Sequence, residues 1–538
     1  MKKLIPVLLI LAVFTACGRK DSGGSQSAEG TAAGAALTIA MHEDIQSLDP
    51  GQAWDFTTNQ VAGQIAEGLV GLDSNDAIVP VLAKSWTQTD DLTYVYDVRD
   101  DILFSDGSKL TMDDVLFSFE RSRDPEGGTY FADFFADVES FTVDGWQFII
   151  KLATPSAVFK YVPATGAGWI ISKAYFEKQG GNFGTASGGV VGTGPFMYQS
   201  WTSGQEVVLK KNPNYWDKEK LAANIFDTVV YKAIPDDTTR VIALQNGDVD
   251  FSINLPLDML DQLSSAASLN YYSFETYHVD SLGFNTQRPP FDDVNARRAV
   301  ALALDIPRMH SVTVKDAGIA GDILPFGPGL YGADKAKWED YVKNSPYNSY
   351  NLDEAKRLLA ASRYPGGFSC DLVIGEASVT GDWALFIQES LKALNISVEI
   401  RKMTGEEQDL RQNGQVFDGN GKRDYDMLIG GWEADYPDLN GNIDILLKSS
   451  QAGENGYNHA AYARPGVDAL IDQQRTTLDP VKRFEVQKEL MDIVVNDVPY
   501  IYLTYPSRQY VLSKKYVSPA VTASWLWSLP LQDIRRAN

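Results

Sequence analysis

The sequence contains little cysteine and histidine, and this limits the chemistry that the chain can perform. Among 538 residues there are two cysteines and four histidines. The histidines lie far apart, at His42, His278, His310 and His459. No His-Glu-x-x-His motif, Gly-x-Ser-x-Gly elbow or Gly-x-x-x-x-Gly-Lys-Ser/Thr loop occurs. An enzyme is therefore the least favoured class of function, and we expect no cofactor.

A calcium loop is also missing, although one segment approaches its pattern. Asp438, Asn440 and Asn442 have the spacing of the first ligands. Ile443 stands where the loop needs glycine, and Ser449 stands where it needs glutamate. We expect no metal site.

The chain has no excess of basic residues, which excludes another class of function. Lys and Arg total 47 against 71 for Asp and Glu, giving a formal charge of −24. Nucleic-acid binding needs a basic face, so we expect no such partner. Hydrophobic residues make up 44% and charged residues 22%, as in ordinary globular proteins. The length allows two or more domains.

Long apolar runs are missing after the first residues, and the run at the start is short. Lys2 and Lys3 precede apolar residues 4–14 and the small residues before Cys17. This pattern predicts a signal peptide at 1–16. It resembles a bacterial lipoprotein signal with Cys17 acylated, although Phe14 stands where Leu is usual; plain secretion with a free Cys17 thiol is the alternative. Cys370 would then have no disulfide partner, and we expect it to be a small buried hydrophobic residue.

Residues 17–36 are small and polar, which predicts a flexible lipidated tether, with order beginning near Leu37. The resulting localisation is the cell envelope, lipid-anchored and facing the periplasm or the outer surface.

The remaining sequence mixes strand and helix patterns. Apolar residues alternate over 93–98 and 146–152, which indicates strands. Thr111 and Asp114 have the spacing of a capping box before a helix at 115–123, and Asn351 and Glu354 repeat it before 355–359. Asp479-Pro480 predicts a helix start. Its apolar side is expected to carry Val481, Phe484, Lys488, Met491 and Val495. The fold class is therefore α/β with several domains.

An ordered set of motifs resembles one family. Gly192-Thr193-Gly194-Pro195-Phe196 precedes Asn212-Pro213-Asn214-Tyr215-Trp216. Further matching segments are 79–86, 91–94, 98–108, 110–115, 284–294, 297–299, 353–355 and 425–427. Together they resemble the peptide-type (family 5) extracellular solute-binding lipoproteins of bacterial ABC importers, such as oligopeptide- and dipeptide-binding proteins, over 37–535.

This resemblance implies a two-lobed periplasmic-binding-protein (type II) clamshell with an extra third domain. By position, lobe I comprises 37–66, 191–283 and 502–538. The additional domain covers 67–190, and lobe II covers 284–501. The family captures peptides between the lobes and delivers them to ABC transporter permease subunits, and we expect a monomer held to the membrane through its lipid anchor only.

The resemblance also implies a ligand contact in the segment 430–438. In peptide binders of this family, an aspartate at the position of Asp435 pairs with the α-amino group of the peptide. Trp432 and Tyr436 are expected to line the same site. The alternative is that Asp435 and Asp438 only shape a polar turn.

Further pocket candidates follow by position. Trp54 and Phe56 are expected in a loop, Tyr130 and Phe131 in the additional domain, and Asn254 after a turn. For each aromatic residue, core packing is an equally good explanation.

Some oligopeptide binders carry an arginine where this chain has Ile429, and the loop 412–423 is long. These features leave the peptide length, and the way the carboxyl end is held, open.

Three hypotheses of function remain besides an enzyme. The first is peptide capture for an ABC importer. The second is a non-peptide solute, an oligosaccharide or a nickel chelate, on the same fold. The third is a surface adhesion lipoprotein that has kept the fold without transport.

Overall fold

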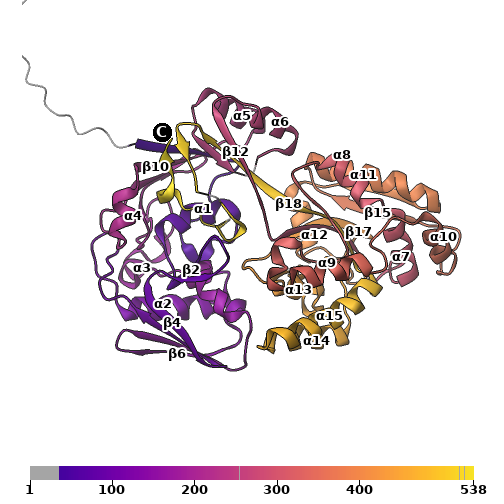
Figure 1. Ribbon diagram of the computed structural model, residues 1–538, viewed down its shortest axis with the longest axis horizontal. Helices are drawn as coiled ribbons and strands as arrows, with labels where there is room; N and C mark the ends of the chain where they lie inside the picture. The colour runs from indigo at the N-terminus through magenta and orange to yellow at the C-terminus, as the bar shows by residue number, and fades with distance from the viewer. Residues whose placement is uncertain (1–34, 254, 520, 526, 538) are drawn as a thin grey trace, which may run out of the picture. The chain divides into compact units, whose positions relative to one another are not determined.

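The computed structural model describes residues 35–253, 255–519, 521–525 and 527–537 (Figure 1). The predicted signal peptide, Cys17 and the tether up to residue 34 lie outside the described residues, as does Asn254. Strand β1 (Ala35–Met41) begins two residues before the predicted start at Leu37, because Ala35 and Ala36 already pair with β10. No helix in the described part of the chain is long and apolar enough to cross a membrane.

The largest sheet of the described chain has 12 strands and confirms the α/β prediction. Its main path runs through β16 (Ser397–Lys402), β15 (Ser369–Ile374), β17 (Met427–Glu433), β13 (His278–Phe284), β18 (Tyr500–Ser513), β11 (Phe251–Ile253), β1, β10 (Phe226–Ala233), β9 (Glu206–Lys211) and β8 (Phe196–Thr202). Two further strands, β12 (Leu269–Glu275) and β14 (Gly318–Ala320), pair with β18.

Strand β18 joins the two halves of this sheet, between β13 and β11. Its first residues pair with β13, and its last residues pair with β11 and β12 (Figure 1, yellow). The turn between β12 and β13, at residues 276–277, makes a second crossing beside it. The chain therefore crosses twice between the two groups of strands, and crossings of this kind are suited to act as a hinge.

Smaller sheets and helices surround the large sheet. The other strands are β2 (Val70–Leu72), β3 (Ile78–Pro80), β4 (Ala83–Asp90), β5 (Thr93–Val98), β6 (Val138–Asp144), β7 (Gln147–Leu152), β19 (Tyr516–Val517) and β20 (Arg535–Arg536). The helices are α1 (Phe56–Ile65), α2 (Met112–Arg123), α3 (Lys173–Gln179), α4 (Lys218–Ala223), α5 (Asp237–Asn246), α6 (Leu260–Ser264), α7 (Val294–Ala303), α8 (Ile306–Thr313), α9 (Lys335–Asn344), α10 (Leu352–Ala360), α11 (Ser378–Leu391), α12 (Gly405–Gln412), α13 (Asn440–Leu447), α14 (Pro465–Thr476) and α15 (Pro480–Asp497).

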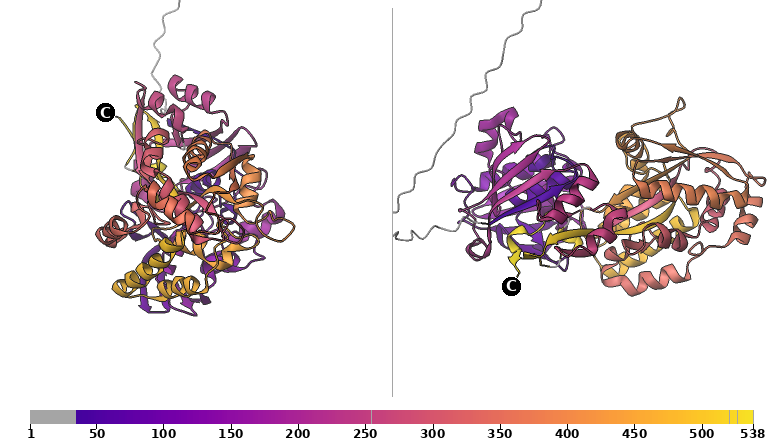
Figure 2. Two further views of the ribbon diagram at one scale, coloured as in Figure 1. Left: turned by 90° about the vertical axis from the view of Figure 1, so that its right-hand side faces the viewer. Right: turned by 90° about the horizontal axis from the view of Figure 1, so that it is seen from above.

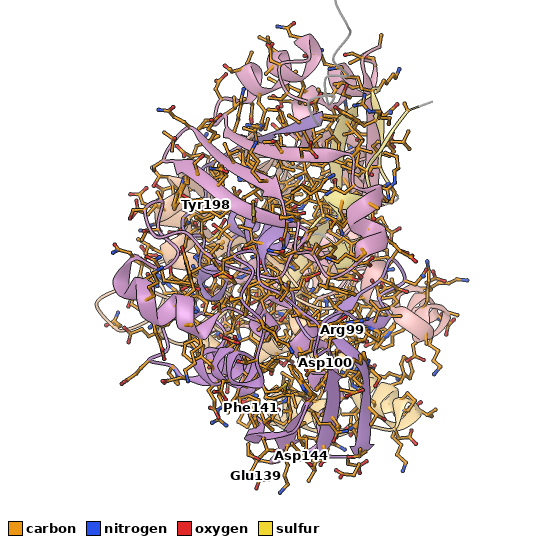
Figure 3. All side chains as sticks on the ribbon, turned by 90° about the vertical axis from the view of Figure 1, so that its left-hand side faces the viewer. Arg99, Asp100, Glu139, Phe141, Asp144 and Tyr198 are labelled. Carbon is orange, nitrogen blue, oxygen red and sulfur yellow. The ribbon has the colours of Figure 1, made fainter. Side chains whose placement is uncertain are left out.

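Buried apolar residues form separate clusters rather than one core. One cluster draws on 69–191, around the four-stranded sheet β4-β5-β7-β6. A second combines 37–65, 171–274 and 510–534. Two more draw on 277–523, and Figure 2 shows these orange segments grouped apart from the indigo and magenta ones. In the first cluster Phe141 packs on Phe119, while Glu139 and Asp144 of the same strand lie at its outer edge (Figure 3).

The local predictions for strands and helix starts are confirmed. Strand β5 buries Tyr94, Tyr96 and Val98, in alternation with less buried neighbours. At the start of α2, the Thr111 hydroxyl accepts from the Asp114 N–H at 3.3 Å, and the Asp114 carboxylate accepts from the Thr111 N–H at 2.8 Å. This is the predicted capping box.

The predicted buried side of α15 is partly wrong. Asp479 caps the helix as expected, but Val481 is 64% exposed and Lys488 pairs with Asp492 at the surface. The buried stripe instead includes Gln487, whose amide donates to Gln474 at 3.2 Å. A buried polar residue with its own partner shifts the stripe away from the side that apolar residues indicate.

Candidate functional site

The segment that carries Asp435 leaves the sheet at the end of β17. This strand lies between β13 and β15, and it ends at Glu433. The chain then turns toward α13. Asp435 is therefore held close to the crossing strands by a rigid element, two residues beyond its last strand position.

Asp435 is a partly buried carboxylate without a partner. Within the described residues, its side chain forms no hydrogen bond or ion pair. Burial, together with the smaller effect of the charge of Glu433, raises the pKa of Asp435 to about 7. An unpaired acid in such surroundings is stabilised by any cation that reaches it.

Neighbouring charges at the crossing strands are already paired with one another. Glu433 accepts from Arg508 at 3.3 Å and faces His278 at 3.5 Å, and His278 also contacts Asp280 at 3.1 Å. Burial alone lowers the pKa of His278, but the two carboxylates raise it to about 9. His278 is therefore cationic at neutral pH. With Asp435 ionised, this group of three carboxylates and two cations is one positive charge short.

Aromatic side chains stand beside this acid. The rings of Trp432 and Tyr457 are 4.9 Å apart. Burial raises the pKa of Tyr457, and the charges of Asp409, Asp435 and Tyr130 raise it further. Tyr457 therefore lies within electrostatic reach of both Asp435 and Tyr130. No sequence motif marks Tyr457, which follows a turn with Gly453 and Gly456.

The predicted aromatic residues of the first 131 positions divide into exposed and buried ones. Trp54 is 52% exposed and Tyr130 is 62% exposed, with ring centroids 6.2 Å apart. Phe131 is only 9% exposed and belongs to the apolar cluster of 69–191. Trp54 and Tyr130 are therefore available to a ligand, whereas Phe131 is packed.

Phe56 does not lie in a loop, as the sequence analysis expected. It is the first residue of α1, because the Asp55 side chain accepts from the Thr58 N–H at 2.8 Å and caps the helix there. The guanidinium of Arg508 lies 4.9 Å from the centre of the Phe56 ring. Phe56 thus borders the charged group at the crossing strands.

Two residues that follow Asp435, Tyr436 and Asp438, have partners elsewhere in the chain. Asp438 forms two hydrogen bonds with the guanidinium of Arg483, at 2.7 and 2.8 Å. Tyr436 is 9% exposed and stacks on Tyr161 with centroids 5.9 Å apart. Asp438 therefore shapes the turn and is neutralised by Arg483, whereas Asp435 has no such partner among the described residues.

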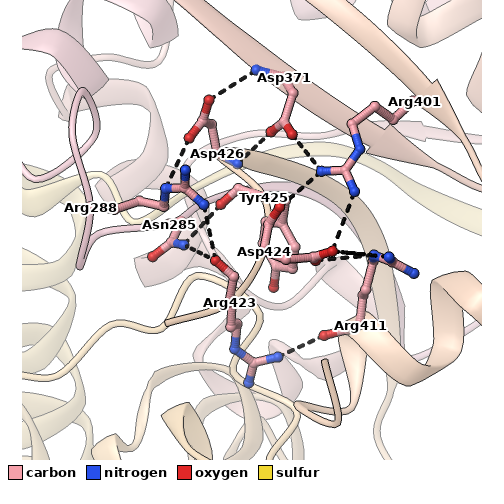
Figure 4. Close-up of polar contacts among 9 residues, drawn as sticks. All are labelled: Asn285, Arg288, Asp371, Arg401, Arg411, Arg423, Asp424, Tyr425 and Asp426. Atoms are coloured by element: carbon pink, nitrogen blue, oxygen red, sulfur yellow. Dashed lines mark hydrogen bonds and ion pairs between the residues drawn. The ribbon is translucent and has the colours of Figure 1, made fainter. Parts of the chain in front are cut away.

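The arginines near the long loop 412–423 are engaged in a network of their own. Figure 4 shows Asp371, Asp424 and Asp426 paired with nearby arginines. Those arginines are Arg288, Arg401 and Arg411. Ile429, at the position where some relatives carry arginine, is buried in the apolar cluster of β17.

Arg423 connects this network to the aromatic residues. Its guanidinium donates to the carbonyls of Arg411 at 2.8 Å and Gly456 at 2.8 Å. Gly456 directly precedes Tyr457. Arg423 therefore fixes the backbone that carries Tyr457.

Other chemistry-bearing residues do not assemble into a second site. Within the described residues, no group of three or more His, Cys, Asp or Glu is placed to hold a metal ion. Burial lowers the pKa of His459 to about 3, so this histidine is neutral. Cys370 is a buried free thiol, as expected.

Comparisons with known proteins agree with the fold. Residues 77–454 match the family model described as "Bacterial extracellular solute-binding proteins, family 5 Middle". The glutathione-binding protein GsiB of Escherichia coli (strain K12) is 26% identical over 499 residues, which cover 92% of each chain.

Two solved structures show the same arrangement. The periplasmic binding protein DppA from Helicobacter pylori, in complex with peptide STSA, has a TM-score of 0.77 at 23% identity over 94% of this chain and 98% of its own. NikZ from Campylobacter jejuni, in complex with Ni(L-His), has a TM-score of 0.77 at 20% identity over 93% and 99%. The predicted type II periplasmic-binding-protein fold is thereby confirmed.

Proposed function

The chain belongs to the bacterial extracellular solute-binding proteins of family 5, and we propose that it captures peptides beside Asp435 and delivers them to an ABC importer. The observation that carries this proposal is the unpaired carboxylate of Asp435 in a group of side chains one cation short. The protonated amino terminus of a peptide supplies that charge. A buried ion pair with good hydrogen bonds then replaces an unfavourable lone acid.

The aromatic residues support a ligand with side chains of its own. Trp432 and Tyr457 form one pair of rings, and Trp54 and Tyr130 form a second, more exposed pair. Flat apolar walls with few fixed polar contacts suit peptides of varied sequence. Phe56 borders the site from α1, and we retain Tyr436 and Phe131 only as residues around it; Asn254 lies outside the described residues and stays a prediction.

A non-peptide solute is the second candidate. The neighbour NikZ carries Ni(L-His) on the same fold, and GsiB is named for binding glutathione. A metal chelate with an amino group also satisfies Asp435. Native mass spectrometry of protein purified without refolding distinguishes these ligands by mass, since a closed cleft retains its ligand during purification.

The proposed division of the chain into lobes and an additional domain is based on the family resemblance and on the separate apolar clusters. Lobe I comprises 37–66, 191–283 and 502–538, the additional domain covers 67–190, and lobe II covers 284–501. The cluster at 69–191 supports the additional domain. The clusters at 277–523 support a separate lobe II, although they extend beyond its proposed ends into 277–283 and 502–523. The mature protein is a monomer anchored by lipid on Cys17 in the cell envelope, and it returns its ligand chemically unchanged.

A cycle of four binding measurements tests the role of Asp435. The ligands are Ser-Thr-Ser-Ala and its N-acetylated form, and the proteins are the wild type and Asp435→Asn. Each single change removes one charge of the pair and should weaken binding by tens-fold, in line with about 2–5 kcal/mol for a buried pair. The two changes together should cost little more than one.

The matched control is Asp382→Asn, an exposed carboxylate of α11 that should bind both peptides like the wild type. Full additivity of the two changes, or equal affinity for acetylated and free peptide, contradicts the proposed pairing.

A further inference from the structure

Two side-chain contacts are central to the junction of segment 67–190 with segment 284–501, on the side of the turn after β17. One is an ion pair between Asp137 and Arg475, and the other is the stack of Tyr161 on Tyr436. Neither is part of the charged group around Asp435. Both need an explanation, because they link parts of the chain that are far apart in sequence.

The ion pair has strong geometry and a fixed position. Arg475 donates to the two oxygens of Asp137 at 2.6 and 3.2 Å, and the side chains are 26% and 16% exposed. Arg475 lies in the last turn of α14, where a cation is favoured by the helix dipole. Its carbonyl also accepts from the Ala157 N–H at 2.8 Å. Three hydrogen bonds therefore meet at one residue.

The aromatic contact adds a flat surface beside the ion pair. The rings of Tyr161 and Tyr436 are inclined by only 6°, and Phe134 meets Tyr436 edge-on at 6.5 Å. Tyr436 directly follows Asp435 in the chain. A shift of this turn therefore moves the proposed ligand contact and the stacked ring together.

The surface between these segments can separate without unfolding. The apolar clusters on the two sides share no residue among those described. The joining contacts are polar or aromatic and few in number. Interfaces of this kind open and close, whereas a shared core does not.

We propose that Asp137–Arg475 and Tyr161–Tyr436 form a latch that holds segment 67–190 against segment 284–501 and slows release of the ligand. Arg475 and Tyr436 are positioning residues: they act on the ligand through the closed state of the protein. The latch rests on the proposed function only for the identity of the ligand. Closure of segment 67–190 against segment 284–501 can therefore be measured separately from peptide binding.

The experiment compares four chains in a full-length Cys17→Ser background. They are the unaltered background, Asp137→Arg, the charge exchange Asp137→Arg with Arg475→Asp, and the control Asp472→Arg. Asp472 also lies on α14, but its partner Lys448 is in the same segment, 2.8 Å away. Small-angle scattering gives the radius of gyration without peptide, and stopped flow gives the dissociation rate of labelled Ser-Thr-Ser-Ala.

We expect Asp137→Arg to enlarge the radius and to speed dissociation by roughly tenfold with little change in association, as for most interface changes. The charge exchange should restore most of both values, and the control should match the background. Thermal melting identifies a variant that fails to fold, and Asp137→Asn then replaces it. Equal radii of gyration in all folded chains overturn the latch, whether or not the peptide binds. If the radii differ but no chain binds the peptide, the latch is supported and the proposed peptide ligand is contradicted.

Discussion

The raised pKa of Asp435 predicts that ligand capture weakens in mild acid. The peptide amine pairs with the ionised carboxylate, so a proton on Asp435 competes with the ligand. With a pKa of about 7, half of Asp435 is ionised at pH 7 and about a tenth at pH 6. The peptide amine has an ordinary pKa of about 8 and stays protonated over this range. The affinity should therefore be about fivefold lower at pH 6 than at pH 7.

Calorimetry can measure both this change and its origin. At pH 6, binding should release about 0.9 proton per peptide from Asp435, which appears as a dependence of the heat on the ionisation enthalpy of the buffer. Asp435→Asn cannot titrate, so its weaker affinity should be level between pH 6 and pH 7. Glu67, whose pKa is also raised by burial to about 7, is unchanged in that variant and serves as an internal control. Parallel pH profiles for the two proteins, or tighter binding by the wild type at pH 6, would refute the reasoning.

Three further predictions concern Asp435, Tyr457 and Cys17. Because the pKa of Asp435 is raised in the folded state, its ionisation costs stability progressively between about pH 4 and pH 7, and the cost is constant at higher pH. Asp435→Asn should therefore stabilise the ligand-free protein by roughly 1–3 kcal/mol at pH 8. The resulting rise in melting temperature should vanish near about pH 3, where Asp435 is neutral in both states. Tyr457→Ala should weaken peptide binding by about tenfold, as for the loss of a buried aromatic contact, while Tyr457→Phe keeps the ring contact with Trp432 and should bind normally; equal loss in both variants would mean that the hydroxyl, not the ring, makes the contact. Cys17→Ser should move the protein from the membrane fraction to the soluble fraction, and continued membrane partition would exclude the lipid anchor.

Sequence patterns predict local structure correctly where residues that are close in the chain interact with one another. The capping box of Thr111 and Asp114 lies within four residues, and the alternation of Tyr94, Tyr96 and Val98 reflects a single strand. The prediction of the buried side of α15 was partly wrong, because there the environment of a residue depends on a distant segment. Gln487 is buried although it is polar, because it donates to Gln474 of another helix, whereas Val481 in the first turn of α15 is exposed.

The sequence by itself determined the family and the fold, because ordered motifs over most of the chain are specific even when each is weak. It also indicated Asp435, through the resemblance. Only the tertiary structure separated Asp435 from Asp438: Arg483 neutralises Asp438, and no described side chain neutralises Asp435. It alone placed Tyr457 beside Trp432. Charge balance and ring contacts are set by side chains that meet only after the chain has folded, so no local pattern can encode them.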